Sequence, residues 1–300
     1  MRYAYYMGCV VPSRLNQYDL AVRNVLKELG VELVDLEDAG CSGTVITRSV
    51  DAKTNLVMST RILALAENKN LNLLVTCPGC YESLKEAQET FHNNTSFKEE
   101  VNTILKKLDG LTYSGEVEVK HLIHVLYEDL GLKNIRGKIK RSLKGLRVAA
   151  HYGCHILRPS NKLKSDNPEN PKILDELIEV TEAKSIYWML KLWCCGSPIL
   201  AIDRDLSLSL TCAKLKSAKD SEADCIVVIC PSCQLQFDFM QNEASRISGE
   251  RYDIPVILYP QLLGLSIGLK PEEVGLHLNK TGIDKFLETL KTIWGEEHGL

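Results

Sequence analysis

The amino-acid sequence repeats one cysteine pattern in its two halves. In each half a short apolar run ends in Gly-Cys, at Gly8-Cys9 and at Gly153-Cys154. Corresponding cysteines lie 145 residues apart at this first position (154 − 9) and 153 apart at the next two (194 − 41 and 230 − 77). A period this long exceeds that of any solenoid repeat, so the pattern indicates a duplicated domain. The later motifs are Cys41-Ser42-Gly43 and Cys77-Pro78-Gly79-Cys80 in the first half, and Cys194-Cys195-Gly196 and Cys230-Pro231-Ser232-Cys233 in the second.

Apolar runs of strand length alternate with helical patterns along the chain, which is typical of an α/β fold with mainly parallel sheets. We therefore expect two pseudo-symmetric α/β domains with open sheets, covering residues 1–140 and 141–300. In an open α/β sheet the ligand crevice lies outside the carboxyl ends of the strands. Because four cysteines follow predicted strands, we expect a metal site at this edge of each sheet. These four are Cys9, Cys77, Cys154 and Cys230.

The predicted elements can be placed by their patterns. Lys133–Lys144 is a basic stretch that we expect to be solvated and to join the halves, and Gly282–Leu300 predicts an amphipathic helix that covers the core or a partner. The expected strands are Arg2–Met7, Val31–Leu36, Leu73–Cys77, Val117–Leu122, Arg147–His151, Ser185–Leu190, Ile226–Cys230 and Pro255–Tyr259. The expected helices include Leu15–Leu29, Thr54–Glu67, Tyr81–Thr90, Lys172–Thr181, Leu206–Ser217 and Leu235–Ser245.

The bulk composition argues against several kinds of partner. Basic residues number 36 and acidic residues 39, so the net charge of −3 gives no reason to expect nucleic acid or an anionic membrane surface. No apolar run is long enough to cross a bilayer, and the N-terminus lacks the pattern of a signal peptide. We therefore expect a cytoplasmic protein. Because the cytosol keeps thiols reduced, the eleven cysteines indicate metal binding or redox chemistry.

The second half has one thiol more than an ordinary four-ligand site needs. A tetrahedral zinc ion and a cubane 4Fe–4S cluster each use four ligands. Adjacent cysteines suit two neighbouring irons better than one ion, so the spacing favours an iron–sulfur centre of unusual shape. Zinc stays an alternative, chiefly in the first half, and a lone C-x-x-C is also typical of a thioredoxin-like dithiol. The five thiols are Cys154, Cys194, Cys195, Cys230 and Cys233, whereas the unmatched Cys212 and Cys225 lie among apolar residues and predict structural roles.

The repeated pattern resembles the CCG domain, present twice, and the chain up to about Gly268 resembles the B subunit of heterodisulfide reductase. Two long strings carry this resemblance beyond the cysteines, at residues 151–159 and 230–238. It implies two non-cubane 4Fe–4S clusters, one in each domain, and reduction of the mixed disulfide of coenzyme M and coenzyme B to two thiols. It also implies two partners, a flavin-containing A subunit and a ferredoxin-like C subunit that delivers the electrons.

One position departs from this family pattern. Ser42 stands where the first cysteine pair would have its second member, which leaves the first half with four thiols. Three outcomes are open: ligation through the serine oxygen, a four-cysteine cluster of altered type, or zinc. We expect an iron–sulfur cluster in the first half and one of the family's non-cubane centres in the second. The expected ligands of the first cluster are Cys9, Cys41, Cys77 and Cys80.

Disulfide reduction also consumes two protons, and histidine is the usual donor near neutral pH. His155 directly follows Cys154 and is the candidate catalytic residue, and for both His155 and His151 the alternative is a packing or hydrogen-bonding role near the strand end. The substrate implied by the resemblance is anionic, so basic side chains should line its pocket. The candidates are Lys85, Arg158, Lys162, Lys164 and Arg204.

Two other functions compete with the disulfide reductase. A CCG subunit of another flavin-linked oxidoreductase complex would keep the fold and reduce a different acceptor. A non-enzymatic assembly protein would use zinc or clusters only as structural elements. Iron and sulfide analysis separates the last class from the other two, and an assay with the coenzyme disulfide separates the first two from each other.

Overall fold

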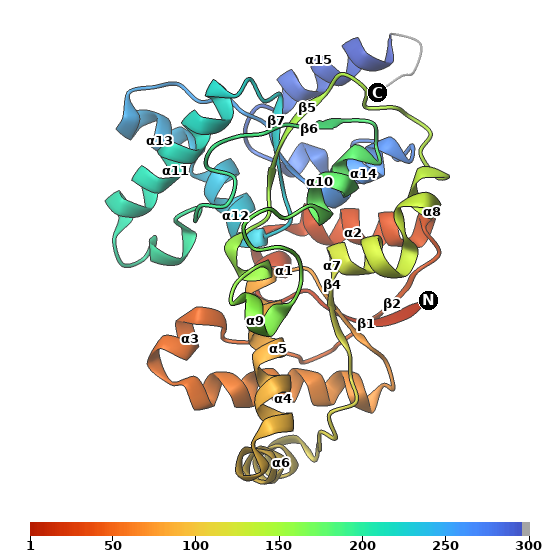
Figure 1. Ribbon diagram of the computed structural model, residues 1–300, viewed down its shortest axis with the longest axis vertical. Coiled ribbons are helices and arrows are strands. Elements are labelled where there is room, and N and C mark those ends of the chain that lie inside the picture. Colours follow the sequence, from red (N-terminus) through yellow and green to blue (C-terminus); the bar gives the residue numbers. More distant parts are fainter. Residues whose placement is uncertain (296–300) are drawn as a thin grey trace.

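The chain folds around two four-stranded parallel sheets that have the same strand order. The computed structural model describes residues 1–295. The first sheet has the order β2-β1-β3-β4 and the second β6-β5-β7-β8, so the α/β duplication predicted from the cysteines is confirmed. Figure 1 shows the strands of the first sheet below those of the second. The strands are β1 (Arg2–Tyr6), β2 (Glu32–Asp35), β3 (Leu73–Val75), β4 (Val119–His121), β5 (Arg147–His151), β6 (Lys184–Ser185), β7 (Cys225–Val228) and β8 (Val256–Leu258).

Apolar composition explains which strands lie inside each sheet. Every residue of β3 and of β7 is buried, which is typical of parallel strands covered by helices on both faces. In the first sheet Leu74 pairs with Tyr5 on one side and with Lys120 on the other. This register aligns the carboxyl ends of β1 and β3, so the segments that follow them meet at one edge.

The duplication extends to the helices that follow the second cysteine motif. In the first half Asp51 accepts hydrogen bonds from the backbone N–H groups of Lys53 and Thr54. In the second half Asp203 accepts one from Leu206, and such caps satisfy donors that a helix leaves free at its start. Both capped helices, α4 (Ala52–Asn68) and α11 (Arg204–Asp220), have 17 residues. The remaining α-helices are α1 (Val10–Arg14), α2 (Asn16–Glu28), α3 (Thr44–Val50), α5 (Pro78–Asn93), α6 (Thr95–Asp109), α7 (Leu122–His124), α8 (Leu132–Arg136), α9 (Ser160–Leu163), α10 (Ile173–Glu179), α12 (Pro231–Gln234), α13 (Gln241–Ser248), α14 (Tyr259–Ser266) and α15 (Ile283–Trp294).

The two halves, here called the first and second lobes, share one continuous apolar core. Helix α2 of the first lobe lies beside α14 of the second (Figure 1). A Cβ atom at Gly264 would lie 3.1 Å from Cγ2 of Val25, so the missing side chain permits this close approach. Asn24 also donates to the carbonyl of Glu273 at 2.7 Å. The division at residue 140 stays a prediction.

The structure corrects three expectations about secondary structure. The strand predicted over Ser185–Leu190 ends at Ser185, because beyond it Tyr187 and Met189 are 85% and 77% exposed. The helix predicted over Leu235–Ser245 is broken by a π-helical turn at residues 235–239. Helix α6 was not predicted, although its buried residues Phe97, Val101 and Leu105 recur at a spacing of four.

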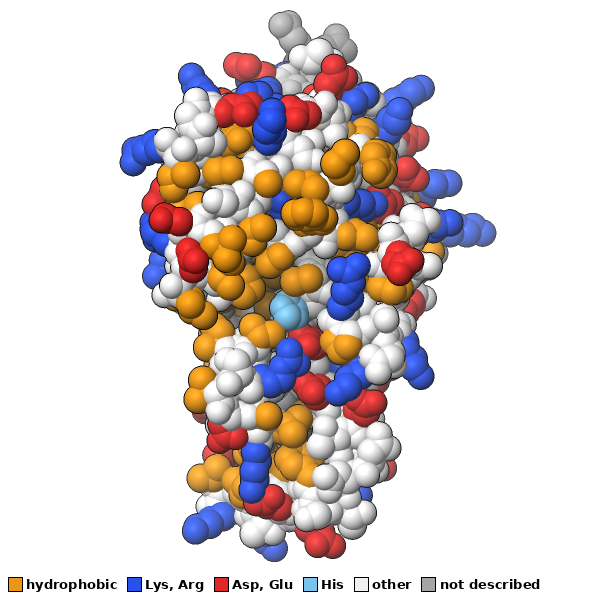
Figure 2. Space-filling model, turned by 60° about the vertical axis from the view of Figure 1, so that its left-hand side comes forward, with side chains coloured by type: hydrophobic (Ala, Val, Ile, Leu, Met, Phe, Trp, Pro, Cys, Tyr) orange, Lys and Arg blue, Asp and Glu red, His pale blue; other side chains and the backbone are white. Residues whose placement is uncertain are grey.

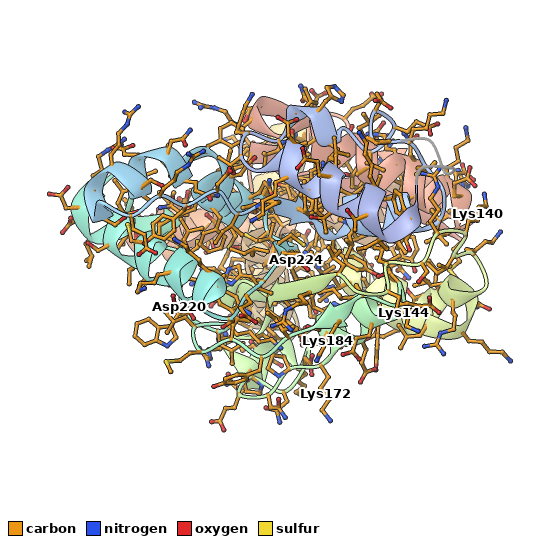
Figure 3. All side chains as sticks on the ribbon, turned by 90° about the horizontal axis from the view of Figure 1, so that it is seen from above. Lys140, Lys144, Lys172, Lys184, Asp220 and Asp224 are labelled. Atoms are coloured by element: carbon orange, nitrogen blue, oxygen red, sulfur yellow. The ribbon has the colours of Figure 1, made fainter. Side chains whose placement is uncertain are left out.

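The basic stretch between the lobes is solvated, as the sequence predicts. Lys133, Lys138, Lys140 and Lys144 are all exposed, and Figure 3 labels Lys140 and Lys144 on the connecting segment. The C-terminal amphipathic helix is present as α15, in which Phe286 and Leu290 are buried. The rest of its predicted range, residues 296–300, lies outside the described residues.

Candidate metal centres

The ends of β1 and β3 bring three cysteines of the first lobe together. Cys9 caps α1, Cys77 caps α5, and Cys80 lies in the first turn of α5. Gly8 has a φ of +73°, and a Cβ atom there would lie 3.1 Å from the sulfur of Cys80. Glycine is therefore needed at this position, both for its backbone conformation and for the space that the thiol uses.

Cys41 completes the first group from a loop. Its sulfur lies 3.7 Å from that of Cys9 and accepts a hydrogen bond from the backbone N–H of Gly43 at 3.3 Å. The hydrogen bond with Cys9 and, to a smaller extent, the one from the Gly43 N–H lower the pKa of Cys41 to about 6 against the opposing effect of burial. Cys41 is thus stabilised as a thiolate, the form that binds metals.

Ser42 occupies the position of the missing fifth thiol and is fully buried. Its carbonyl accepts hydrogen bonds from Asn55 at 2.8 Å and Ser59 at 3.2 Å, but its hydroxyl has no hydrogen-bond partner among residues 1–295. A buried hydroxyl without a partner is costly. The Ser42 oxygen is therefore suited to serve as an additional metal ligand at the first site.

The second lobe gathers five cysteines in the corresponding places. Cys154 follows β5, Cys230 caps α12, and Cys233 lies within that helix. Cys194 and Cys195 lie in the loop before α11 and accept hydrogen bonds from the backbone N–H groups of Gly196 at 3.4 Å and Ser197 at 3.5 Å. Hydrogen bonds from Cys154 and Cys195 lower the pKa of Cys194 to about 2. The adjacent pair therefore includes a strongly stabilised thiolate.

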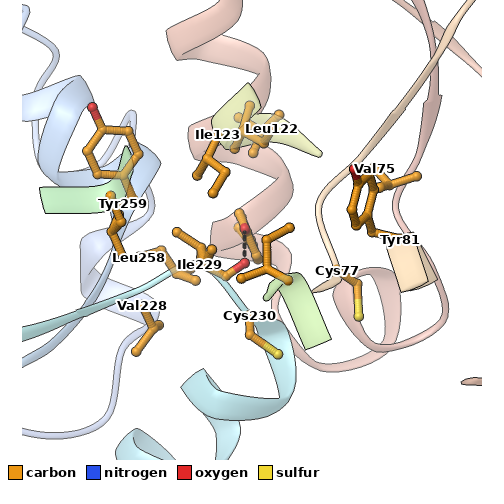
Figure 4. Packing of buried hydrophobic residues seen from close by; sticks show 14 of the residues in the cluster. Val75, Cys77, Tyr81, Leu122, Ile123, Val228, Ile229, Cys230, Leu258 and Tyr259 are labelled. Atoms are coloured by element: carbon orange, nitrogen blue, oxygen red, sulfur yellow. Dashed lines mark hydrogen bonds between the residues drawn. The ribbon is translucent and has the colours of Figure 1, made fainter. Parts of the chain in front are cut away.

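The two cysteine groups meet where the lobes meet. Figure 4 shows Cys77 and Cys230 at the ends of their strands, with both sulfur atoms pointing to the same side. Hydrogen bonding from Cys230 lowers the pKa of Cys77 well below its usual value. The buried hydroxyl of Tyr18 approaches the carbonyls of Thr76 at 3.0 Å and Ile229 at 2.7 Å. These carbonyls directly precede Cys77 and Cys230, so one side chain ties both strand ends together.

A cavity of about 430 Å³ borders both groups. Its walls include Cys77 from the first lobe and four cysteines from the second, together with apolar residues of α3 and of the loop before α11. Of the basic side chains predicted to line a substrate pocket, only Arg204 lies here. Lys85, Lys162 and Lys164 line a separate depression of about 540 Å³, because α5 and α9 carry them away from the cysteines.

His155 lies in the cavity wall and contacts the other lobe. Its Nδ1 atom forms a hydrogen bond with Glu82 of α5, and Glu82 also accepts one from Arg48 at 2.7 Å. Burial lowers the pKa of His155, but the hydrogen bond and the charge of Glu82 outweigh it and raise the pKa overall. The contact between Glu82 and His155 could not be predicted from the sequence, because the two residues belong to different halves of the duplication.

His151 has a packing role, as predicted. It is buried, its Nε2 atom lies 3.2 Å from the sulfur of Cys233, and burial lowers its pKa well below the usual value. Cys225 is fully buried in β7, and the thiol of Cys212 donates to the carbonyl of Ala244 at 3.2 Å. Neither cysteine lines the shared cavity.

The cysteine groups offer the soft thiol ligands that iron–sulfur clusters use. All eleven cysteines are free thiols. Within the described part of the chain, no three His, Cys, Asp or Glu side chains converge closely enough to hold one metal ion. A cluster of several irons spreads its thiolate ligands over more space than one tetrahedral ion, and soft sulfur ligands suit iron–sulfur clusters.

Comparison with known proteins agrees with this arrangement. The CCG cysteine-rich domain matches the chain twice, over residues 3–85 and 148–238. A crystal structure of a hypothetical protein from Helicobacter pylori has the same fold, with a TM-score of 0.74 over 93% of this chain and 52% of that one, at 18% identity. The chain therefore belongs to the CCG family of cysteine-rich proteins.

Within this family two relatives are informative. The B subunit of the ferredoxin/F420H2-dependent CoB–CoM heterodisulfide reductase of Methanosarcina acetivorans is 36% identical over 96% of both chains. The 8-methylmenaquinol:fumarate reductase membrane anchor subunit of Wolinella succinogenes is 31% identical over 92% of this chain and 96% of that one. The chain thus belongs with the B subunits of heterodisulfide reductase, among subunits of oxidoreductases. No helix within residues 1–295 has both the length and the apolar character required to span a bilayer.

Proposed function

We propose that the chain is the iron–sulfur catalytic subunit of a heterodisulfide reductase and reduces the mixed disulfide of coenzyme M and coenzyme B to two thiols. The shared cavity carries this proposal, because Cys77 of one lobe and Cys154 and Cys230 of the other border it. A small disulfide in this space would lie next to both cysteine groups. The relative with 36% identity has the corresponding name.

We further propose a 4Fe–4S cluster at each cysteine group, non-cubane at least in the second lobe. When bound, such clusters supply one-electron transfer and an iron that can bind a released thiolate. The nine cysteines position the clusters through the strand ends and the N–H groups already described. The ligands are Cys9, Cys41, Cys77 and Cys80 in the first lobe and Cys154, Cys194, Cys195, Cys230 and Cys233 in the second.

Residues around the cavity would bind the substrate and supply a proton. Because Glu82 engages Nδ1 of His155, the proton that this histidine can deliver is the one on Nε2. The Arg204 guanidinium attracts a carboxylate or phosphate of the substrate, although it also pairs with Glu243 at 2.5 Å. The apolar wall of α3 excludes water from the cleaved bond.

The electron donor would be the ferredoxin-like C subunit, in a complex with a flavin-containing A subunit. The loop that leads into Cys194 exposes three large apolar side chains, Tyr187, Met189 and Trp193. Figure 2 shows that hydrophobic side chains also gather above the middle of one face of the molecule. Exposed aromatic residues are common in protein interfaces, and this loop is directly joined to the second group. The free thiols also fit the cytoplasmic location that we infer.

A second candidate keeps the clusters and changes the acceptor. The relative from Wolinella succinogenes is named as a subunit of a fumarate reductase and is nearly as similar over nearly as much of the chain. In this case the chain would pass electrons within another flavin-linked complex.

The test is anaerobic production of the chain with its partner subunits, followed by iron and sulfide analysis and assays with two acceptors. Reduction of the coenzyme disulfide by the iron-containing complex supports the first function. An iron-containing complex that reduces fumarate and leaves the disulfide intact supports the second. A colourless protein without iron would refute both and leave a structural role.

A further inference from the structure

In each lobe one capped helix holds the loop that carries the second cysteine motif. On α4, Asn55 and Ser59 donate to the carbonyl of Ser42 at 2.8 and 3.2 Å. On α11, Ser207 donates to the carbonyl of Gly196 at 2.9 Å and Thr211 to that of Cys195 at 3.0 Å. Counted from the caps Asp51 and Asp203, the two pairs occupy the same positions, four and eight residues into the helix. The duplication has therefore kept this contact.

The next inward position, eleven residues after each cap, differs between the lobes. It is Ile62 on α4 and Lys214 on α11, and both side chains are fully buried. The Lys214 ammonium donates to the carbonyls of Leu190 and, at 3.1 Å, Trp193. It also lies 4.5 Å from the centre of the Trp188 ring. Lys214 thus holds the segment that leads directly into Cys194.

The charged groups that favour this buried ammonium are the cysteines of the second site. Burial lowers the pKa of Lys214 to about 8, and the thiols of Cys233, Cys195, Cys194 and Cys154 act in the opposite direction when they are ionised. At neutral pH the side chain is therefore mainly protonated. A buried charge is costly unless it is partnered; the two carbonyls and the Trp188 ring stabilise the Lys214 ammonium, and a negatively charged site nearby would stabilise it further.

The two lobes differ at two matched places by a thiol, which would be a thiolate once it binds a cluster, and by a lysine. The second lobe has the thiol Cys195 where the first has Ser42, and it has Lys214 where the first has Ile62. We propose that Lys214 is a positioning residue whose buried positive charge balances the fifth thiolate of the second site and raises the reduction potential of the cluster held there. This inference rests on the proposed function.

The physical reason is the low effective dielectric of the site. A fixed cation near the cluster favours the state with one more electron, and this attraction is screened far less in the interior than at the surface. Removal of the charge should therefore make one-electron reduction of the second cluster at least about tenfold less favourable, which is about 59 mV for one electron. The first cluster has Ile62 at the matched position and should not respond.

The test is a redox titration, followed by electron paramagnetic resonance, of the anaerobically purified chain in its complex. Three variants are compared: Lys214→Met and Lys214→Gln remove the charge, and Lys214→Arg keeps it. Lys216→Met is the matched control, since Lys216 belongs to the same helix and its side chain is 55% exposed. We expect the potential of the second cluster to fall in the Met and Gln variants and to stay near wild type in the Arg variant and the control.

If Lys214 acted only through its hydrogen bonds, the potential of the second cluster would stay nearer to wild type in Lys214→Gln than in Lys214→Met, because glutamine can still donate to the two carbonyls. A wild-type potential in both neutral variants, with both clusters bound, would overturn the inference and leave the proposed function intact. If the neutral variants lose iron from the second site while the Arg variant retains it, the charge is still required. Loss of that iron from all three variants would contradict the inference. Absence of iron from the wild-type protein would instead refute the proposed function.

Discussion

The two lobes share a scaffold and differ in the chemistry of their cysteine sites. Both have the same parallel strand order, and both place a capped helix against the loop of the second cysteine motif. Ser42 and Ile62 of the first lobe correspond to Cys195 and Lys214 of the second. The buried strands and helix caps thus preserve the fold, whereas two buried positions determine how many thiols each cysteine group has and whether a buried lysine holds the loop that leads into it.

The largest expected effect comes from making the second site resemble the first. Cys195→Ser leaves four thiols and an oxygen, the same set as in the first lobe. Loss of a ligand should exceed the roughly 10–100-fold cost of losing an outer-shell partner, so we expect disulfide reduction to fall by at least about 100-fold. Activity and iron content of the purified complex measure this.

Cys212→Ser is the matched control, because this thiol donates to the carbonyl of Ala244 and belongs to neither cysteine group. It should retain iron and activity. Near-normal disulfide reduction by Cys195→Ser would contradict a catalytic role for the second lobe.

An intermediate effect is expected from a second asymmetry between the lobes. The first cysteine is followed by Val10 in one lobe and by His155 in the other, so only the second lobe offers a proton donor there. His155→Gln should lower kcat for disulfide reduction by about 100-fold, the lower range for loss of a general acid, with little change in KM. Steady-state kinetics with the coenzyme disulfide measure both constants.

Glu82→Gln should lower kcat less, because the imidazole is still present but is no longer held by a carboxylate. His92→Gln serves as control, since this exposed histidine also lies on α5 and is far from the cysteine cavity. A raised KM with an unchanged kcat in His155→Gln would indicate substrate binding rather than proton transfer.

The smallest expected effect concerns the tie between the lobes. Tyr18→Phe removes a buried hydroxyl shared by the carbonyls of Thr76 and Ile229. Loss of this partner should reduce the free energy of unfolding by about 1–3 kcal/mol. Tyr259→Phe is the matched control within the second lobe, where the hydroxyl donates to the carbonyl of Leu177 at 2.8 Å and has no second carbonyl partner within residues 1–295. Denaturant titrations of the two variants compare these losses, and an equal or smaller loss for Tyr18→Phe would contradict the bridging role.

Much of the scaffold could be predicted from the sequence because its signals are local. Strand-length apolar runs located β1, β3, β5 and β7, and the cysteines that follow them indicated the sheet edge at which the groups lie. The predicted strand at Ser185–Leu190 was wrong because the alternating apolar pattern continues beyond the end of the sheet. Trp188 is buried there without strand pairing, and its indole N–H donates to the carbonyl of Ala150 at 2.9 Å.

The contacts between the lobes could not be predicted, because they depend on how two folded units pack. Glu82 approaches His155 across this boundary, and nothing in the local sequence of either residue indicates it. The unusual position of Lys214, in contrast, can be recognised in the sequence, because matching polar residues follow Asp51 and Asp203. When the two helices are aligned from these caps, Lys214 is the charged residue at a position where the first helix has Ile62.

The shared cavity has a consequence for how the chain tolerates change. Its walls come from α3 and α5 on one side and from the second lobe on the other, so its width is set by the docking of the lobes. A side chain at Gly264 of α14 would meet Val274 at 2.4 Å and Val25 of α2 at 3.1 Å from its Cβ atom, so it would press on the contact between the lobes without touching a cysteine. We therefore expect the shape of the cavity to depend on this helix packing as well as on the loops that carry the cysteines.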